Sequence, residues 1–211
     1  MFRVAHVLQQ LEYLSRDDTT RRFTLTNKLL QLGSPSGGSR GLVESSLPAM
    51  RGLLKATKET TQLCCLSDKE NVVLEQLIST HPFKYTTALG ARVPCYSCAP
   101  GKAMVACLPR EEQDDLLKRL AFKKFTATTI TSRSAFRREL AQIQRDGYSV
   151  DRAEGLDGIH CVAAAIRDRH GQPVGALTIA GPMSRLAEPE FPRLGAMLIA
   201  AARAVEANYN A

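Results

Sequence analysis

Apolar residues recur every third or fourth position in several stretches of the chain, and this spacing places them on one face of an α-helix. In the first stretch Val4, Val7 and Leu11 share such a face. One stretch contains an interior proline, Pro48, which would kink or interrupt a helix. The pattern predicts helices over residues 3–13, 28–32, 43–58, 99–107, 111–120, 134–145 and 190–208.

Shorter runs of alternating or continuous apolar residues predict β-strands between these helices. Polar, turn-forming segments separate the runs, and the tetrapeptide Arg169-His-Gly-Gln172 is typical of a hairpin. Because successive runs lie close together in sequence, we expect antiparallel pairing. The predicted strands are residues 14–16, 22–25, 62–66, 72–78, 85–91, 148–151, 159–168 and 173–180.

A segment rich in Ser, Pro and Gly at residues 34–39 separates the first elements from the rest and is a linker by composition. After it, helical and extended pieces are mixed along the chain, as in the α+β class. The sequence therefore predicts a small helix–hairpin unit at residues 1–33, a linker and connecting helix at 34–60, and an antiparallel-sheet domain at 61–211.

The charge is unevenly distributed along the 211 residues. The chain carries 28 basic and 21 acidic residues, a formal net charge of +7, which favours an anionic partner. The first 60 residues hold nine Lys and Arg against five Asp and Glu. Neither a membrane-spanning apolar run nor the apolar segment of a signal peptide is present. We therefore expect a cytoplasmic protein with no membrane partner.

The stretch PCYSCAPGKAMVACLP at residues 94–109 holds several chemically suggestive groups. Its Gly-Lys pair, Gly101 and Lys102, does not belong to a phosphate loop, which requires G-x-x-x-x-G-K-[ST]. Tyr96 stands where the first glycine is needed, and Ala103 follows the lysine. Both the phosphate cradle and the magnesium ligand are therefore missing.

The same stretch contains a Cys-x-x-Cys pair, Cys95 and Cys98. A structural zinc site needs four ligands, and the adjacent Cys64 and Cys65 have the wrong spacing for a second pair. A thioredoxin-like pair needs a strand-to-helix turn that stabilises a thiolate, but the surrounding βαβ pattern is absent. Small buried cysteines lining a turn are the alternative. We expect no metal and no cofactor, and a metal or redox protein remains a competing hypothesis.

A different function for this turn is the binding of an anion. Pro100 suits the first turn of a helix, and Gly101 lets a ligand approach the backbone. Free N–H groups at a helix N-terminus favour a carboxylate. Elsewhere, Asp151 and Glu154 could act as paired carboxylates, but no nucleophile or metal set accompanies them, so we expect no enzyme.

The order of these motifs resembles the isocitrate lyase regulator (IclR) family of bacterial transcriptional regulators over essentially the whole chain. Residues 90–103 contain the Gly-Lys-Ala typical of the family's effector loop, and residues 147–164 are similar to its strongest signature. Three other segments match. Residues 3–17 are similar to half of a recognition helix and the first wing strand, and residues 22–33 are similar to the second wing strand and the step into the linker helix. Residues 175–182 are similar to the final strand.

This resemblance implies a winged helix-turn-helix followed by a GAF-like effector domain. It implies a dimeric or tetrameric repressor or activator of a catabolic operon, with a small organic acid as effector and DNA as partner. By the same resemblance, the effector-binding residues are Ala99, Pro100, Gly101, Asp151, Ile159 and Cys161. The candidate DNA contacts are Arg3, Arg16, Arg21, Arg22 and Lys28.

Arg3 falls inside the recognition helix itself, so the two helices that should precede it do not occur in this sequence. We therefore expect an N-terminally truncated member with an incomplete winged helix-turn-helix. The alternative function is a small-molecule sensor with a vestigial DNA unit that acts through oligomerisation.

Overall fold

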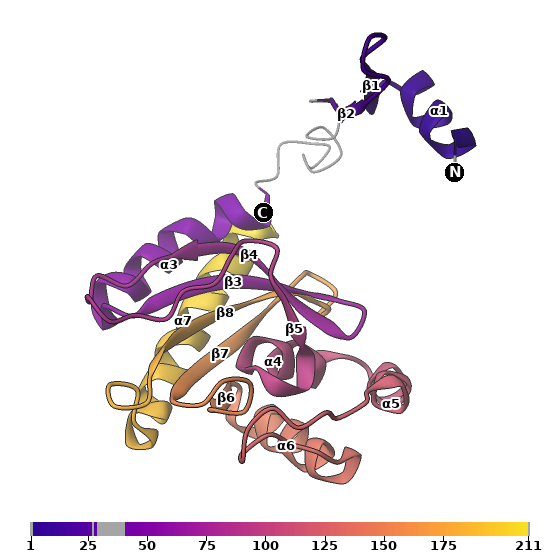
Figure 1. Ribbon diagram of the computed structural model, residues 1–211. Helices are drawn as coiled ribbons and strands as arrows, with labels where there is room; N and C mark the ends of the chain where they lie inside the picture. The colour runs from indigo at the N-terminus through magenta and orange to yellow at the C-terminus, as the bar shows by residue number, and fades with distance from the viewer. Residues whose placement is uncertain (1, 27, 29–40, 211) are drawn as a thin grey trace. The chain divides into compact units, whose positions relative to one another are not determined.

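The computed structural model describes residues 2–26, 28 and 41–210 and divides the chain into two compact units, Met1–Gly41 and Leu42–Ala211. Figure 1 shows the helices and strands of both units. No helix in the described part of the chain is long and apolar enough to cross a membrane. Each unit is described by itself below.

The first unit contains a helix and a two-stranded hairpin. Helix α1 spans Phe2–Gln10, and strands β1 (Leu14–Arg16) and β2 (Phe23–Leu25) pair antiparallel, as predicted. The helix ends earlier than predicted, because Glu12 adopts a left-handed backbone conformation with φ of 61°. The predicted helix at 28–32, apart from Lys28, and the predicted linker at 34–39 lie outside the described residues.

The second unit is built on a six-stranded antiparallel sheet with the order β5-β4-β3-β8-β7-β6. This confirms the predicted α+β class with an antiparallel sheet. The strands are β3 (Thr60–Ser67), β4 (Glu70–Leu77), β5 (Arg92–Pro94), β6 (Ser149–Arg152), β7 (Ile159–Arg167) and β8 (Pro173–Pro182).

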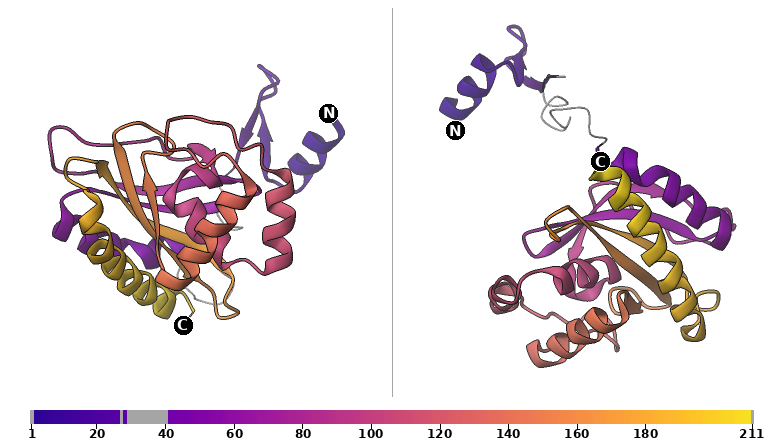
Figure 2. Two further views of the ribbon diagram at one scale, coloured as in Figure 1. Left: turned by 90° about the horizontal axis from the view of Figure 1, so that it is seen from below. Right: turned by 180° about the vertical axis from the view of Figure 1, so that it is seen from behind.

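Two long helices, α3 (Leu42–Thr57) and α7 (Phe191–Tyr209), lie side by side over one face of the sheet (Figure 2). Side chains alternate between the two faces of a strand. Leu177 therefore packs in the core beneath α3 and α7, while its neighbour Ala176 packs on the other face against Met104. The predicted periodicity thus builds two cores, one on each side of the sheet.

The opposite face carries α4 (Ala99–Cys107), and α5 (Arg110–Arg119) and α6 (Arg133–Asp146) pack around it. Ser132 caps the N-terminus of α6, where its Oγ accepts a hydrogen bond from the Ala135 N–H at 3.2 Å. Gly147 caps the C-terminus, and its φ of 78° is left-handed. These caps fix the helix that runs into β6.

One predicted strand is wrong. Residues 85–91 are irregular, and the short strand β5 follows them. Two backbone hydrogen bonds with Val73 of β4, one donated by Gly90 and one accepted by Ala91, hold the end of this segment, and side chains hold the rest. Thr60 Oγ1 donates to the Tyr85 carbonyl at 2.6 Å, and the Gln76 side chain bonds both the N–H and the carbonyl of Thr87, each at 3.1 Å. The apolar pattern alone does not distinguish these two ways of fixing an extended segment.

Helix α3 differs from its prediction in two respects. It continues through Pro48 without interruption. Pro48 and Glu44 are both exposed, so water can satisfy the Glu44 carbonyl that the proline leaves free. The helix also packs on the sheet and on α7, so the second compact unit begins at Leu42 and includes the helix that we expected as a separate connector.

Candidate ligand-binding site

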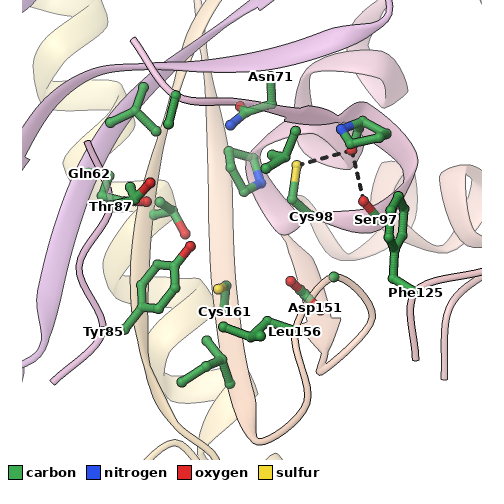
Figure 3. A pocket seen from close by; sticks show the side chains of 18 residues that line it. Gln62, Asn71, Tyr85, Thr87, Ser97, Cys98, Phe125, Asp151, Leu156 and Cys161 are labelled. Atoms are coloured by element: carbon green, nitrogen blue, oxygen red, sulfur yellow. Dashed lines mark hydrogen bonds between the residues drawn. The ribbon is translucent and has the colours of Figure 1, made fainter. Parts of the chain in front are cut away.

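A cavity of about 270 Å³ opens between the first turn of α4, the irregular segment after β4 and the loop between β6 and β7 (Figure 3). Its size is close to the lower end of typical small-molecule sites, about 300–1,000 Å³. Most of its wall is apolar, and no lysine, arginine or histidine is among the described residues that line it. The polar side chains at its wall are those of Gln62, Asn71, Tyr85, Thr87, Ser97, Asp151 and Thr178.

The structure brings four of the six predicted effector-binding residues together at this cavity. Pro100 comes from α4, Asp151 from β6, and Ile159 and Cys161 from β7. They meet because β6 pairs with β7, which places Asp151 opposite Cys161 in the ladder, while α4 packs across the same face. Whether they bind an effector stays a prediction.

The other two predicted residues, Ala99 and Gly101, are not among the residues that line the cavity. Ala99 is fully buried and packs against Cys161 and neighbouring small residues. A Cβ at Gly101 would lie 2.5 Å from both the Cα and the carbonyl oxygen of Cys95. Gly101 therefore permits close packing of two backbone segments rather than the approach of a ligand.

The Cys-x-x-Cys pair lies at the predicted strand-to-helix turn, but its thiols are buried. Burial raises the pKa of Cys95 to about 12. Burial also raises the pKa of Cys98 well above its ordinary value, although the Gly101 N–H opposes this. A thioredoxin-like pair needs an accessible thiol with a lowered pKa, so the burial of both thiols argues against the redox hypothesis. No group of three or more potential metal ligands occurs in the described part of the chain.

Among the described residues that line the cavity, Asp151 is the one that carries a carboxyl group. It is 5% exposed, and its Oδ1 accepts a hydrogen bond from the Glu154 N–H at 2.7 Å. Burial raises the pKa of Asp151 to about 7, and the nearby Glu154 carboxylate adds to the effect, while Lys102 opposes it. Asp151 can therefore be protonated or ionised near neutral pH, and a protonated carboxyl donates a hydrogen bond.

A buried cluster of ion pairs includes Glu154, whose backbone N–H donates to Asp151. Lys102 Nζ is fully buried and donates to Glu154 Oε1 at 2.6 Å and to Glu139 Oε1 at 2.9 Å. Burial by itself would lower the pKa of Lys102, but the two carboxylates outweigh it and raise the pKa. The Thr129 hydroxyl fixes the same loop by donating to the Glu154 carbonyl at 2.6 Å.

Sequence reasoning missed Lys102, Asn71 and Tyr85 as parts of this region. From the sequence, Lys102 is considered only as part of a phosphate loop, which the pattern excludes. Asn71 falls just before the predicted strand 72–78, although it lies in β4, and Tyr85 falls in the predicted strand 85–91. No local pattern marks these residues, because the sheet and the helix α4 bring them together only in the folded unit.

The first unit contains the predicted DNA contacts. Arg16, Arg21 and Arg22 are exposed on or beside the hairpin, and the Arg16 guanidinium lies 5.7 Å from the centroid of the Phe23 ring. The Lys28 Nζ pairs with Glu12 Oε2 at 3.1 Å. Arg3 lies in α1, but its side chain is outside the described part. The structure thus groups three exposed cations near the hairpin turn.

The fold and the cavity define an α+β sensor-type domain, and comparisons with known proteins identify its family. Residues 38–207 match the family model described as "Bacterial transcriptional regulator IclR C-terminal". The chain therefore belongs to the IclR family of bacterial transcriptional regulators. This confirms the resemblance inferred from the sequence motifs.

Among curated relatives, the HTH-type transcriptional regulator KdgR of Escherichia coli is 31% identical over 98% of this chain and 79% of its own length. The transcriptional repressor IclR of the same organism is 31% identical over 98% of this chain and 76% of its own length. These relatives are named as regulators, not as enzymes.

Solved structures share the fold. The Thermotoga maritima IclR structure has a TM-score of 0.78 and 27% identity, over 100% of this chain and 85% of that one. An IclR homologue from Microbacterium hydrocarbonoxydans, complexed with 4-hydroxybenzoate, has a TM-score of 0.77 and 24% identity, over 98% of this chain and 83% of that one.

Proposed function

We propose that this protein is a ligand-responsive, DNA-binding regulator of a catabolic operon, and that a small organic acid bound in the cavity beside Asp151 is its effector. The observation that carries the proposal is the cavity itself. It is small and mainly apolar, and it lies in a domain of a family of transcriptional regulators.

The polar groups at the wall are compatible with an acid, although none of the described residues that line the cavity is cationic. The first turn of α4 directs backbone N–H groups toward its N-terminal end, where a carboxylate is favoured. Asp151, with a pKa raised to about 7 by burial, can take up a proton and donate it in a hydrogen bond to the ligand. The homologue complexed with 4-hydroxybenzoate, an aromatic acid, supports the same class of ligand.

For DNA, we propose that Arg16, Arg21 and Arg22 contact phosphates from the hairpin, with Arg3 and Lys28 contributing from the adjacent segments. Lysine and arginine contacts to phosphates supply salt-dependent affinity but no sequence discrimination by themselves. We further propose that the protein acts as a homodimer or homotetramer, since paired half-sites are read by paired recognition elements.

Two measurements test the proposal. Isothermal titration calorimetry with a panel of small aliphatic and aromatic carboxylates should find at least one that binds. The Pro100→Phe variant, whose larger side chain fills the cavity, should not bind that acid. Fluorescence anisotropy should show tighter binding to the protein's own upstream region than to random DNA at physiological salt, with a change when the acid is added.

The outcomes separate the two functions considered. Acid binding without discrimination between the upstream region and random DNA would contradict the DNA-binding part and favour the sensor that acts through oligomerisation. The absence of binding by every acid would contradict the effector class.

A further inference from the structure

The polar side chains that line the cavity differ in whether the protein itself satisfies their hydrogen bonds. Gln62 Nε2 donates to Gln76 Oε1 at 2.9 Å, and Thr178 Oγ1 donates to the Val162 carbonyl at 2.9 Å. Asp151 accepts the backbone hydrogen bond described above. These groups are engaged by neighbouring strands and loops, so the protein itself accounts for their presence.

Asn71 is different. It is 2% exposed, it lines the cavity, and its Oδ1 has no hydrogen-bond partner in the described part of the chain. Its side chain also lies near the buried thiol of Cys64, whose pKa it lowers against the larger effect of burial. A buried carbonyl oxygen without a partner costs free energy, and a donor on a bound ligand would remove that cost.

The position of Asn71 in the sheet does not by itself require an amide side chain. Asn71 lies in β4 between Leu66 of β3 and Val93 of β5, and Val73, two residues along the same strand, shares its face. Val73 and Val93 line the same cavity. An apolar side chain would pack equally well on this wall. The amide differs from it by presenting a hydrogen-bond acceptor to the cavity.

Asn71 and Asp151 belong to different walls of the cavity (Figure 3). Asn71 comes from β4, next to the edge strand β5, whereas Asp151 comes from β6, the edge strand at the opposite side of the sheet. The Tyr85 hydroxyl points into the space between the walls. A ligand whose acid group is held near Asp151 and the start of α4 can therefore present a second group to Asn71.

We propose that Asn71 determines ligand specificity. Its side-chain carbonyl oxygen accepts a hydrogen bond from a hydroxyl or amino group of the effector, so the cavity selects acids that carry such a second group over the same acids without it. This inference rests on the proposed function, because it presupposes an organic acid in this cavity.

The test uses two matched pairs of acids and the full chain. Calorimetry compares 4-hydroxybenzoate with benzoate and 3-hydroxypropionate with propionate. In the unsubstituted protein, the hydroxylated member of at least one pair should bind about tenfold more tightly or better. Asn71→Leu keeps the branched shape and the number of side-chain heavy atoms but removes the acceptor, so the affinity ratio within that pair should fall to about one.

Two further variants control the test. Leu156→Ala alters an exposed apolar residue that lines the cavity from the loop between β6 and β7, and it should change both affinities by the same factor, which leaves the ratio intact. Asn71→Ala also removes the acceptor. If thermal melts show that Asn71→Leu is not folded, the affinity ratio is measured in Asn71→Ala instead, and it should again fall to about one.

The failures are distinguishable. If acids bind but the hydroxyl gives no advantage, or if the advantage survives in Asn71→Leu, this inference is overturned while the proposed function stands. If no acid of either pair binds, at concentrations up to the solubility limit, the organic-acid effector and this inference fall together.

Discussion

Replacing Asp151 by asparagine should make the protein progressively more stable, relative to the unsubstituted protein, as the pH rises from 5 to 8. Asparagine keeps an oxygen that can accept the Glu154 N–H but carries no charge. Asp151 is buried, and its pKa is raised from 3.8 to about 7, mainly by burial. In the unfolded chain, an aspartate ionises near its ordinary pKa of about 3.9.

The sign follows from linkage. Because the pKa of Asp151 is raised in the folded state, its contribution to stability is fully present below about pH 4 and is lost as the pH rises through about 7. Between pH 5 and pH 8 this amounts to about 2–3 kcal/mol of unfolding free energy, since one pKa unit is worth about 1.4 kcal/mol. For a domain of this size, that corresponds to about 5–10 °C in melting temperature.

The assay is urea unfolding of both proteins across this pH range, followed by circular dichroism. The matched control is Asp115→Asn, because Asp115 is exposed and its pKa is lowered by its hydrogen bond to Lys118. Asp115 stays ionised in both states above pH 5, so the control curve should run parallel to that of the unsubstituted protein. Parallel curves for Asp151→Asn as well would refute the raised pKa and the reasoning built on it.

Three further outcomes are expected. Gly101→Ala should lower the unfolding free energy by about 1–3 kcal/mol or more, because the added Cβ would collide with the backbone of Cys95; unchanged stability in a urea titration would contradict this packing. Lys102→Met should destabilise by about 3–5 kcal/mol, since it leaves the buried carboxylate of Glu154 without its cation, whereas Lys118→Met on the exposed face of α5 should change stability by less than about 1 kcal/mol. Affinity for a carboxylate effector should fall about tenfold per pH unit above 7, because Asp151 must be protonated to donate to the ligand; calorimetry that finds a flat profile from pH 6 to 8.5 would exclude that donor.

The role that the motif predicts for Gly101 differs from the role that its packing shows. A glycine beside a helix N-terminus is a common way to bring a ligand close to the backbone, and the family resemblance likewise implies that Gly101 belongs to the effector site. The structure uses its missing Cβ to bring α4 against the turn at Cys95 instead. Both uses leave the same residue in the sequence, so only the neighbouring backbone distinguishes them.

Asn71 and Lys102 show a second limit. Each is polar, and each is almost fully buried, but a polar residue in a sequence is expected at the surface. Burial of Lys102 depends on Glu139 and Glu154, which lie 37 and 52 residues away along the chain. No local pattern contains that information.

The sequence by itself determined the helices α3 to α7, the hairpins β1–β2, β3–β4 and β7–β8, the antiparallel class and the family, because periodicity, caps and turn residues are local properties of the chain. Pro100, Asp151, Ile159 and Cys161 could be named in advance through the resemblance. Only the tertiary structure decided that these four share a cavity, that Ala99 and Gly101 serve packing, and that Asn71 and Asp151 line different walls of it. Those facts depend on which strands pair and which face α4 covers, and contacts between distant segments form only when the sheet and its helices pack together.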